Sequence, residues 1–244
     1  MEWLDEGIIL STRRHGDSSA VVSLFTENHG RHAGLARGAR GSKSRGVYQQ
    51  GNEASVTWRA RLPEHLGSIN CELKSAHAAK VIDDPLRLTA LSSICALAYL
   101  SLPERHPYPD LYRKTLLFIN DLHETMLWPM RLVIWELELL GDLGFGLDLS
   151  SCALTGQTHD LAYVSPRSGR AVSKDAGAPY RKKLLRLPSF ALNYSEITEL
   201  DAGEVFDGLK LTGWFISRHL LVDRSGTLPA ARERLLDQWS EGSK

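Results

Sequence analysis

Apolar and polar residues alternate along much of the first eighty residues. Runs rich in β-branched and aromatic residues stand at 7–11, 20–26, 31–36, 53–61 and 68–75. Gly16-Asp17 and Asn28-His29-Gly30 separate the first three runs and are typical of tight turns. The pattern therefore predicts five short, half-buried strands.

From about Pro85 onward the apolar residues recur with the period of an α-helix. Helices are predicted at 86–102, at 110–122, after Pro129, at 206–220 and at 228–239. Between 150 and 180 the helical period disappears, so we expect an irregular insert or a small β-turn module there. The pattern predicts an α+β protein with a strand domain at 1–80 and a helical domain at 81–244.

Five short strands in about eighty residues suit a small closed or partly closed barrel. The OB-fold is the commonest such barrel, although an SH3-like barrel also fits the strand count. We therefore predict an N-terminal five-stranded OB-fold β-barrel, followed by an α-helical domain that contains the insert, with the SH3-like barrel as the alternative.

Charge separates into segments although the totals cancel, with 29 Lys and Arg against 29 Asp and Glu. One basic segment has Glu53 as its only acid and consists of Arg31, Arg37, Arg40, Lys43, Arg45, Arg59 and Arg61. A second has Asp175 as its only acid and consists of Arg167, Arg170, Lys174, Arg181, Lys182, Lys183 and Arg186. This distribution permits nucleic-acid binding without requiring it.

Gly, Ser and cations dominate the segment 37–46, between the third and fourth predicted strands. Such a segment has nothing to bury, so we expect a mobile loop. Its cations could follow a phosphate chain, with Trp58 or Phe25 supplying stacking for bases. The alternative is a solvated linker beside a core Trp58, and composition leaves both open.

Two smaller groups in the helical half carry weaker signals. Arg181-Lys182-Lys183 could extend a nucleic-acid surface or merely solvate the start of a helix. Arg218-His219 could line a pocket for an acidic peptide, although a solvated helix face is the simpler interpretation.

Enzyme motifs are absent from the sequence, which contains no P-loop, no G-x-S-x-G and no G-x-G-x-x-G pattern. His123-Glu124 lacks the second histidine of a metalloprotease helix. The start of the chain is acidic where a signal peptide is basic, and no apolar run is long enough to span a membrane. The chain has three separated cysteines, which argue against a disulfide framework. We expect a non-catalytic cytoplasmic protein.

Several of these residues together resemble the RecO family of bacterial recombination mediators. The likeness begins with Asp5-Glu6-Gly7-Ile8-Ile9-Leu10 and Gly16-Asp17-Ser18-Ser19. It is densest at Arg37-Gly38-Ala39-Arg40 with Lys43-Ser44-Arg45, and it continues at Leu143-Gly144-Phe145 and Ser165-Pro166-Arg167-Ser168-Gly169-Arg170. The order and spacing of these motifs over nearly the whole chain carry the resemblance.

The resemblance implies an N-terminal OB-fold that binds single- and double-stranded DNA and anneals complementary strands. It also implies RecR and the C-terminal tail of the single-strand-binding protein SSB as partners, and help for RecA in replacing SSB at gaps. The expected DNA-binding residues are Arg14, Arg31, Arg37, Arg40, Lys43, Arg45, Arg59, Arg61, Arg181, Lys182 and Lys183. Arg218 and His219 are the candidates for binding the acidic SSB tail. An RNA-binding OB-fold protein and a scaffold for an acidic protein remain the alternatives.

The chain departs from part of this family at a zinc site. Some members carry two C-x-x-C pairs in the insert, whereas the matching positions here are Cys152, Thr155, Ser173 and Ala176. One thiolate of four cannot supply a tetrahedral zinc site. We therefore predict no metal or other cofactor, and an insert held by packing.

Overall fold

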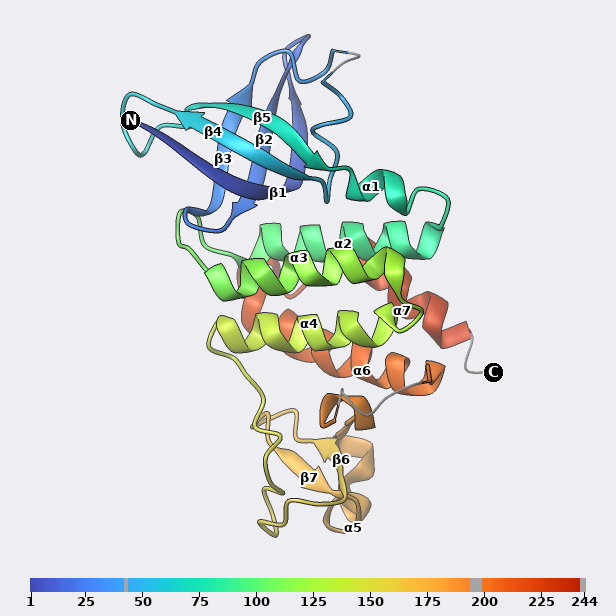
Figure 1. The fold of residues 1–244 in the computed structure, drawn as a ribbon. Helices are drawn as coiled ribbons and strands as arrows, with labels where there is room; N and C mark the ends of the chain where they lie inside the picture. The colour runs from blue at the N-terminus through green and yellow to red at the C-terminus, as the bar shows by residue number, and fades with distance from the viewer. Residues whose placement is uncertain (42–43, 194–198, 242–244) are drawn as a thin grey trace. The chain divides into compact units, whose positions relative to one another are not determined.

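The computed structural model describes residues 1–41, 44–193 and 199–241. The chain forms two compact units, Met1–Glu124 and Thr125–Lys244 (Figure 1). The predicted domain boundary near Lys80 falls inside the first unit, after its last strand, and stays a prediction. Within the described residues, no helix combines the length and the apolar character needed to cross a membrane.

Five strands close into a barrel at the start of the first unit (Figure 1). They are β1 (Glu2–His15), β2 (Ser19–Thr26), β3 (Gly30–Ala36), β4 (Glu53–Arg59) and β5 (Ser68–Ser75). Their order is β1-β2-β3-β5-β4, with β3 and β5 parallel and the other pairs antiparallel. The barrel is an OB-fold, as the strand pattern predicts.

Strand β1 is the longest because it pairs on both of its edges. Its first half pairs with β4 and its second half with β2, and the register to β2 shifts between Ile9 and Ser11. Such a bulge bends a strand and increases its twist, which lets one strand join two sides of a small barrel. Gly34 on β3 allows a close approach to β5, since a Cβ there would lie 2.9 Å from the Ile69 side chain.

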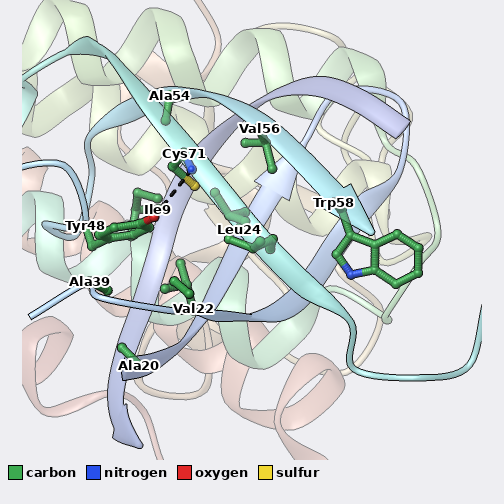
Figure 2. Packing of buried hydrophobic residues seen from close by; sticks show 12 residues of the cluster. Ile9, Ala20, Val22, Leu24, Ala39, Tyr48, Ala54, Val56, Trp58 and Cys71 are labelled. Atoms are coloured by element: carbon green, nitrogen blue, oxygen red, sulfur yellow. Dashed lines mark hydrogen bonds between the residues drawn. The ribbon is translucent and has the colours of Figure 1, made fainter. Parts of the chain in front are cut away.

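The barrel core is formed by inward side chains of all five strands (Figure 2). The segment between β3 and β4 contributes to it as well, because Ala39 and Tyr48 are buried in the same cluster. The Tyr48 hydroxyl accepts a hydrogen bond from the Cys71 amide at 3.4 Å. The expectation that residues 37–46 have nothing to bury is therefore wrong at Ala39.

Three helices complete the first unit, namely α1 (His77–Lys80), α2 (Pro85–Ser101) and α3 (Pro109–Glu124). Helix α2 begins after Asp84, whose carboxylate caps it by accepting from the Leu86 and Arg87 amides. Helices α2 and α3 pack against β1 and β2, where Phe25 meets Tyr112 edge to face with ring centroids 5.6 Å apart.

The second unit has a helical part and a small sheet. The helical part contains α4 (Trp128–Asp142), α6 (Ala202–Phe215), the π-helix η4 (Ile216–Leu220), the short η5 (Val222–Arg224) and α7 (Ala230–Glu241). Strands β6 (Leu161–Val164), β7 (Ala171–Ser173) and β8 (Leu185–Arg186) form a sheet in the order β7-β6-β8. Beside it lie α5 (Lys174–Gly177), η1 (Ala178–Lys183) and η2 (Ser189–Ala191). The predicted insert therefore contains regular structure and is not irregular throughout.

A fully buried ion pair joins the helices of the second unit. Arg232 of α7 lies with its Nε 2.6 Å from Glu136 Oε1 and its Nη2 3.0 Å from Oε2, on α4. Arg232 also donates to the Leu209 carbonyl at 2.5 Å, and the Thr212 hydroxyl of α6 donates to Glu136. The pair therefore holds three helices in one arrangement.

Candidate nucleic-acid interface

A row of outward side chains crosses the barrel with an arginine at each end. The strand registers place Arg13 opposite Val21, Val21 opposite Leu35, Leu35 beside Ser68, and Ser68 opposite Arg59. Residues paired in this way point to the same face of a sheet. Because the barrel is closed, the row follows its curved wall, and four strand spacings of about 4.8 Å give roughly 19 Å along that wall. The row includes β2 and β3, the strands on which OB-folds bind oligonucleotides.

A hollow of about 360 Å³ lies where this row reaches β5 and β4. It is lined by Leu35, Arg37, Thr57, Arg59, Ser68, Ile69 and Asn70. Arg37 and Arg59 are far apart in sequence, and the pairing of β3 with β5 brings them to one hollow. The lining combines two guanidinium groups, hydroxyl and amide groups, and apolar surface, with no carboxylate among these residues.

Arg14 and Arg40 meet at the turn between β1 and β2. The Arg40 amide donates to the Ser18 carbonyl at 3.1 Å, and its guanidinium donates to the Asp17 carbonyl at 3.3 Å. Arg14 donates to the Gly16 carbonyl at 3.1 Å and lies 3.5 Å from the exposed Asp17 carboxylate. The turn thus gathers two exposed guanidinium groups beside one carboxylate.

Arg45 and Arg61 are also exposed, in the β3–β4 and β4–β5 connections. Arg59 lies 2.7 Å from the Glu2 carboxylate of β1, a pairing that raises the pKa of the guanidinium. An approaching phosphate would compete with Glu2 for Arg59. Lys43, the remaining predicted contact of this segment, lies outside the described residues.

Arg31 is placed away from this group. It begins β3 while Arg37 follows the end of that strand, a separation of roughly 20 Å along an extended chain. Its Nε donates to the Leu102 carbonyl at 2.7 Å, and Nη1 lies 3.1 Å from Glu104. The guanidinium also lies over the Tyr99 ring, 5.3 Å from its centroid. These contacts tie β3 to the end of α2, so the structure gives Arg31 a packing role.

Trp58 and Phe25 are both buried, so neither presents a ring to a base. Trp58 packs in the barrel core and its Nε1 donates to the Leu66 carbonyl at 3.1 Å. The hypothesis that they supply stacking is wrong. Strand alternation alone does not tell which face of a barrel strand is outside.

The second unit carries the remaining predicted cations. Arg181, Lys182 and Lys183 end the helix η1 and are all exposed. No ion pair is found for these three side chains within the described parts of the chain. They are exposed and could meet an anion, and their contact with DNA stays a prediction.

Arg218 and His219 are neighbours in sequence but face different surroundings. Arg218 lies over the Trp214 ring, 4.9 Å from its centroid, at a hollow of about 350 Å³. The hollow is lined by Leu185, Leu209, Lys210, Gly213, Trp214, Ser217, Arg218, Leu228 and Leu236. Sequence reasoning missed Lys210 and Trp214, although Lys210, Trp214 and Arg218 follow one another at intervals of four residues, which places all three on one helix face.

Cys152 keeps part of the arrangement of a thiolate site. The Ser173 amide lies 3.2 Å from its Sγ atom. Burial acts to raise the pKa of Cys152, but hydrogen bonds from Ser173 and Thr155 prevail and lower it to about 6. Across the described residues, no group of three or more His, Cys, Asp or Glu side chains is placed to hold a metal ion.

The barrel and its cation-lined face define an OB-fold protein with a second, largely helical unit. Residues 1–76 match the family model described as recombination protein O N terminal, and residues 82–227 match recombination protein O C terminal. The DNA repair protein RecO of Rhodospirillum rubrum is 46% identical with all of both chains covered. That of Rhodospirillum centenum is 49% identical over 98% of this chain and 95% of the relative. The chain belongs to the RecO family of DNA repair proteins, which confirms the resemblance found in the sequence.

Proposed function

We propose that this chain is a non-catalytic, cytoplasmic recombination mediator that binds single- and double-stranded DNA through the outer face of its barrel. The observation that carries the proposal is the hollow lined by Arg37 and Arg59, at one end of a row that begins with Arg13. Arg14 and Arg40 at the β1–β2 turn, with Arg45 and Arg61, extend the positive face. No cofactor is needed for this role.

The mechanism is electrostatic and steric. Guanidinium groups pair with backbone phosphates and release counterions, which gives affinity without sequence readout. The outward side chains between the arginines are Val21, Leu35 and Ser68. They are shorter than arginine, which leaves room for a strand of DNA. Neutralising the phosphates of two complementary strands lets them approach and anneal.

The hollow beside Trp214 suits the acidic tail of SSB. Its walls are mainly Leu side chains, while Lys210 and Arg218 stand at the same hollow. A peptide that combines carboxylates with a terminal apolar residue would place the apolar group among the leucines and the carboxylates near the two cations. His219 lies at a different hollow and is not needed for this contact.

Together these two surfaces would let one molecule bind DNA and SSB at once. Tethering the chain to SSB-coated gaps raises its effective concentration near the single strand. RecR then acts with it to help RecA replace SSB, and Arg181, Lys182 and Lys183 supply further contacts to DNA.

The test is fluorescence anisotropy of a labelled single strand, titrated with the full chain at several salt concentrations. The variant Arg37→Ala/Arg40→Ala/Arg59→Ala removes three cations from the face, and Lys80→Ala/Arg224→Ala/Arg234→Ala removes three exposed cations elsewhere. At a slope of roughly 0.7 per phosphate contact, the first variant should flatten the salt dependence by about 2, and the control should not.

The alternatives predict different results in the same assay. Preference for RNA in direct competition would support an RNA-binding OB-fold protein. A scaffold for an acidic protein predicts no DNA binding even at low salt. For the tail, a labelled SSB C-terminal peptide should bind the wild type and lose affinity in Arg218→Ala, while His219→Ala leaves it unchanged.

A further inference from the structure

A second hollow in the second unit is built from aromatic rings and a cation. It measures about 170 Å³ and is lined by Phe145, Gly146, Leu147, Arg167, Ser168, Gly169, Phe215 and His219. Three parts of the chain contribute, namely the segment after α4, the turn between β6 and β7, and the end of α6 with η4. The DNA-binding face and the Trp214 hollow do not include these rings.

The rings form a stack that reaches the surface. The His219 ring lies nearly parallel to Phe145, with centroids 5.1 Å apart, and nearly parallel to Phe215 at 5.9 Å. Phe215 is buried, whereas Phe145 is 41% exposed. An exposed phenyl ring at the open end of a stack offers a flat apolar face to another ring.

Hydrogen bonds hold the three parts of the hollow in place. The Asp148 amide donates to the Gly169 carbonyl at 3.0 Å, and the Ala171 amide donates to the Asp148 carbonyl at 2.9 Å. The Trp214 indole of α6 donates to the Pro166 carbonyl at 3.4 Å. The hollow is therefore organised before any ligand arrives.

Gly169 keeps this space open. Its φ of +68° is a conformation that other residues rarely adopt, and a Cβ there would lie 3.2 Å from Leu147 and 3.7 Å from the Phe215 ring. His219 lies on the π-helix η4, a rare widened turn that is frequent at functional sites. The absent side chain of Gly169 leaves the hollow unfilled, and the π-helix positions the His219 ring at its wall.

The charge of the hollow favours an anionic ligand. Arg167 is exposed and lines it, and no carboxylate is among the lining residues. The nearby Asp148 carboxylate is already engaged by Arg170 at 3.2 Å and by the Ser150 hydroxyl at 2.6 Å. A planar ring linked to a phosphate matches the stack and the guanidinium together.

We propose that this hollow binds one nucleobase of single-stranded DNA, stacked on Phe145 with its phosphate near Arg167. The inference rests on the proposed function, since it adds to the proposed binding of single-stranded DNA a contact between one base and the second unit. It differs from the barrel face, where the contacts are to phosphates. A peptide side chain is less suited, because Arg167 favours an anion beside the ring, which a nucleotide supplies in its phosphate.

The experiment compares a labelled oligothymidylate with an abasic strand of the same length, using the full chain. Wild type should bind the base-bearing strand roughly tenfold more tightly, the effect of stacking one base on an aromatic ring. Phe145→Leu should abolish this preference while leaving the affinity for the abasic strand unchanged, and Phe145→Tyr should restore it. Tyr180→Leu removes a more exposed ring, 54% against 41% for Phe145, outside the hollow and should change nothing.

The outcomes separate this inference from the proposed function. If neither strand binds at low salt, both ideas fail. If both strands bind and the Arg37→Ala/Arg40→Ala/Arg59→Ala variant weakens both, yet Phe145→Leu keeps the full base preference, the stacking site is wrong and the DNA-binding role stands. Loss of the preference in Tyr180→Leu as well would also overturn the assignment to this hollow.

Discussion

Single residues decide how much of the positive face is open to a phosphate. The Glu2 carboxylate lies beside the Arg37–Arg59 hollow, with its Oε1 2.7 Å from Nη2 of Arg59. Both side chains are largely exposed, so the pair contributes little to stability, and its main effect is to neutralise a guanidinium on the proposed face. If DNA binds to the proposed face, the pairing therefore opposes that binding.

Replacing Glu2 by Gln should tighten binding of single-stranded DNA several-fold at low salt, because Arg59 then binds its phosphate without first giving up a carboxylate. Anisotropy titrations against wild type measure this. Arg59→Gln should act in the opposite direction, and Glu72→Gln, an exposed acid on β5 outside the hollow, is the control. Unchanged or weaker binding in Glu2→Gln would exclude Arg59 from the contact.

Another residue-scale prediction concerns the buried pair of Glu136 and Arg232. Glu136→Gln leaves the Arg232 charge without its carboxylate in a site with no exposed surface, so the free energy of unfolding should fall by about 3–5 kcal/mol. The double variant Glu136→Leu/Arg232→Met should recover most of the loss, since it removes both charges. Urea unfolding of the three proteins measures the difference. A loss below about 1 kcal/mol would mean that the pair behaves like an exposed one.

Among the elements, the barrel strands could be predicted because their alternation is strong, and the ends of β1 could not. Residues 5–6 and 12–15 are polar, and they pair only because β4 and β2 lie beside them. The short strands β7 and β8 have three and two residues, too few for a periodic signal. Their pairing with β6 depends on tertiary contacts, which the β-propensity of single residues does not predict.

The proposed DNA-binding face also depends on long-range pairing. The composition predicts a basic segment, but the meeting of Arg37 with Arg59 depends on the parallel pairing of Leu35 with Ser68. Arg31 belongs to the same basic segment of the sequence as Arg37 and Arg59. Its capture by Glu104, 73 residues away, is a long-range contact.

The insert allows a prediction at this scale. Thr155 and Ser173 already hydrogen-bond to Cys152, and Ala176 follows Ser173 by three residues, within α5. The wild-type chain should purify without zinc. Thr155→Cys/Ser173→Cys/Ala176→Cys completes two C-x-x-C pairs and should bind one equivalent of zinc, with a rise in melting temperature that a chelator reverses.

Metal content and thermal melting of the purified proteins measure this outcome. The matched control is Thr158→Cys/Ser168→Cys/Ala178→Cys, which adds three thiols to exposed positions of the same insert. Zinc bound equally by the control would show that any added thiols suffice. Failure of the first variant to bind zinc would mean that the insert no longer has the geometry of the site.

At the scale of the whole molecule, two buried histidines couple the stability of the first unit to pH. In the described structure neither ring nitrogen of His32 or His77 has a hydrogen-bond partner. Burial, followed by the charges of Arg105 and His29, lowers the pKa of His32 to about 4. Burial, followed by Lys80 and His123, lowers the pKa of His77 to about 4, although Glu53 lies 3.9 Å away.

An unfolded histidine has a pKa of about 6.5, so between that pH and about 4 the unfolded chain binds protons that the folded chain does not. Stability is therefore fully present above pH 6.5 and falls as the pH decreases, by roughly 1.4 kcal/mol for each unit of lowered pKa.

His77→Leu should remove one of the two contributions, because leucine cannot be protonated and leaves no unpartnered nitrogen. The unfolding free energy of this variant should fall less than that of wild type between pH 7 and pH 5, when both are measured by urea unfolding. The exposed His15→Leu is the control and should follow wild type. Equal losses in wild type and His77→Leu would show that His77 is protonated in the folded first unit, and that its surroundings supply a partner at low pH.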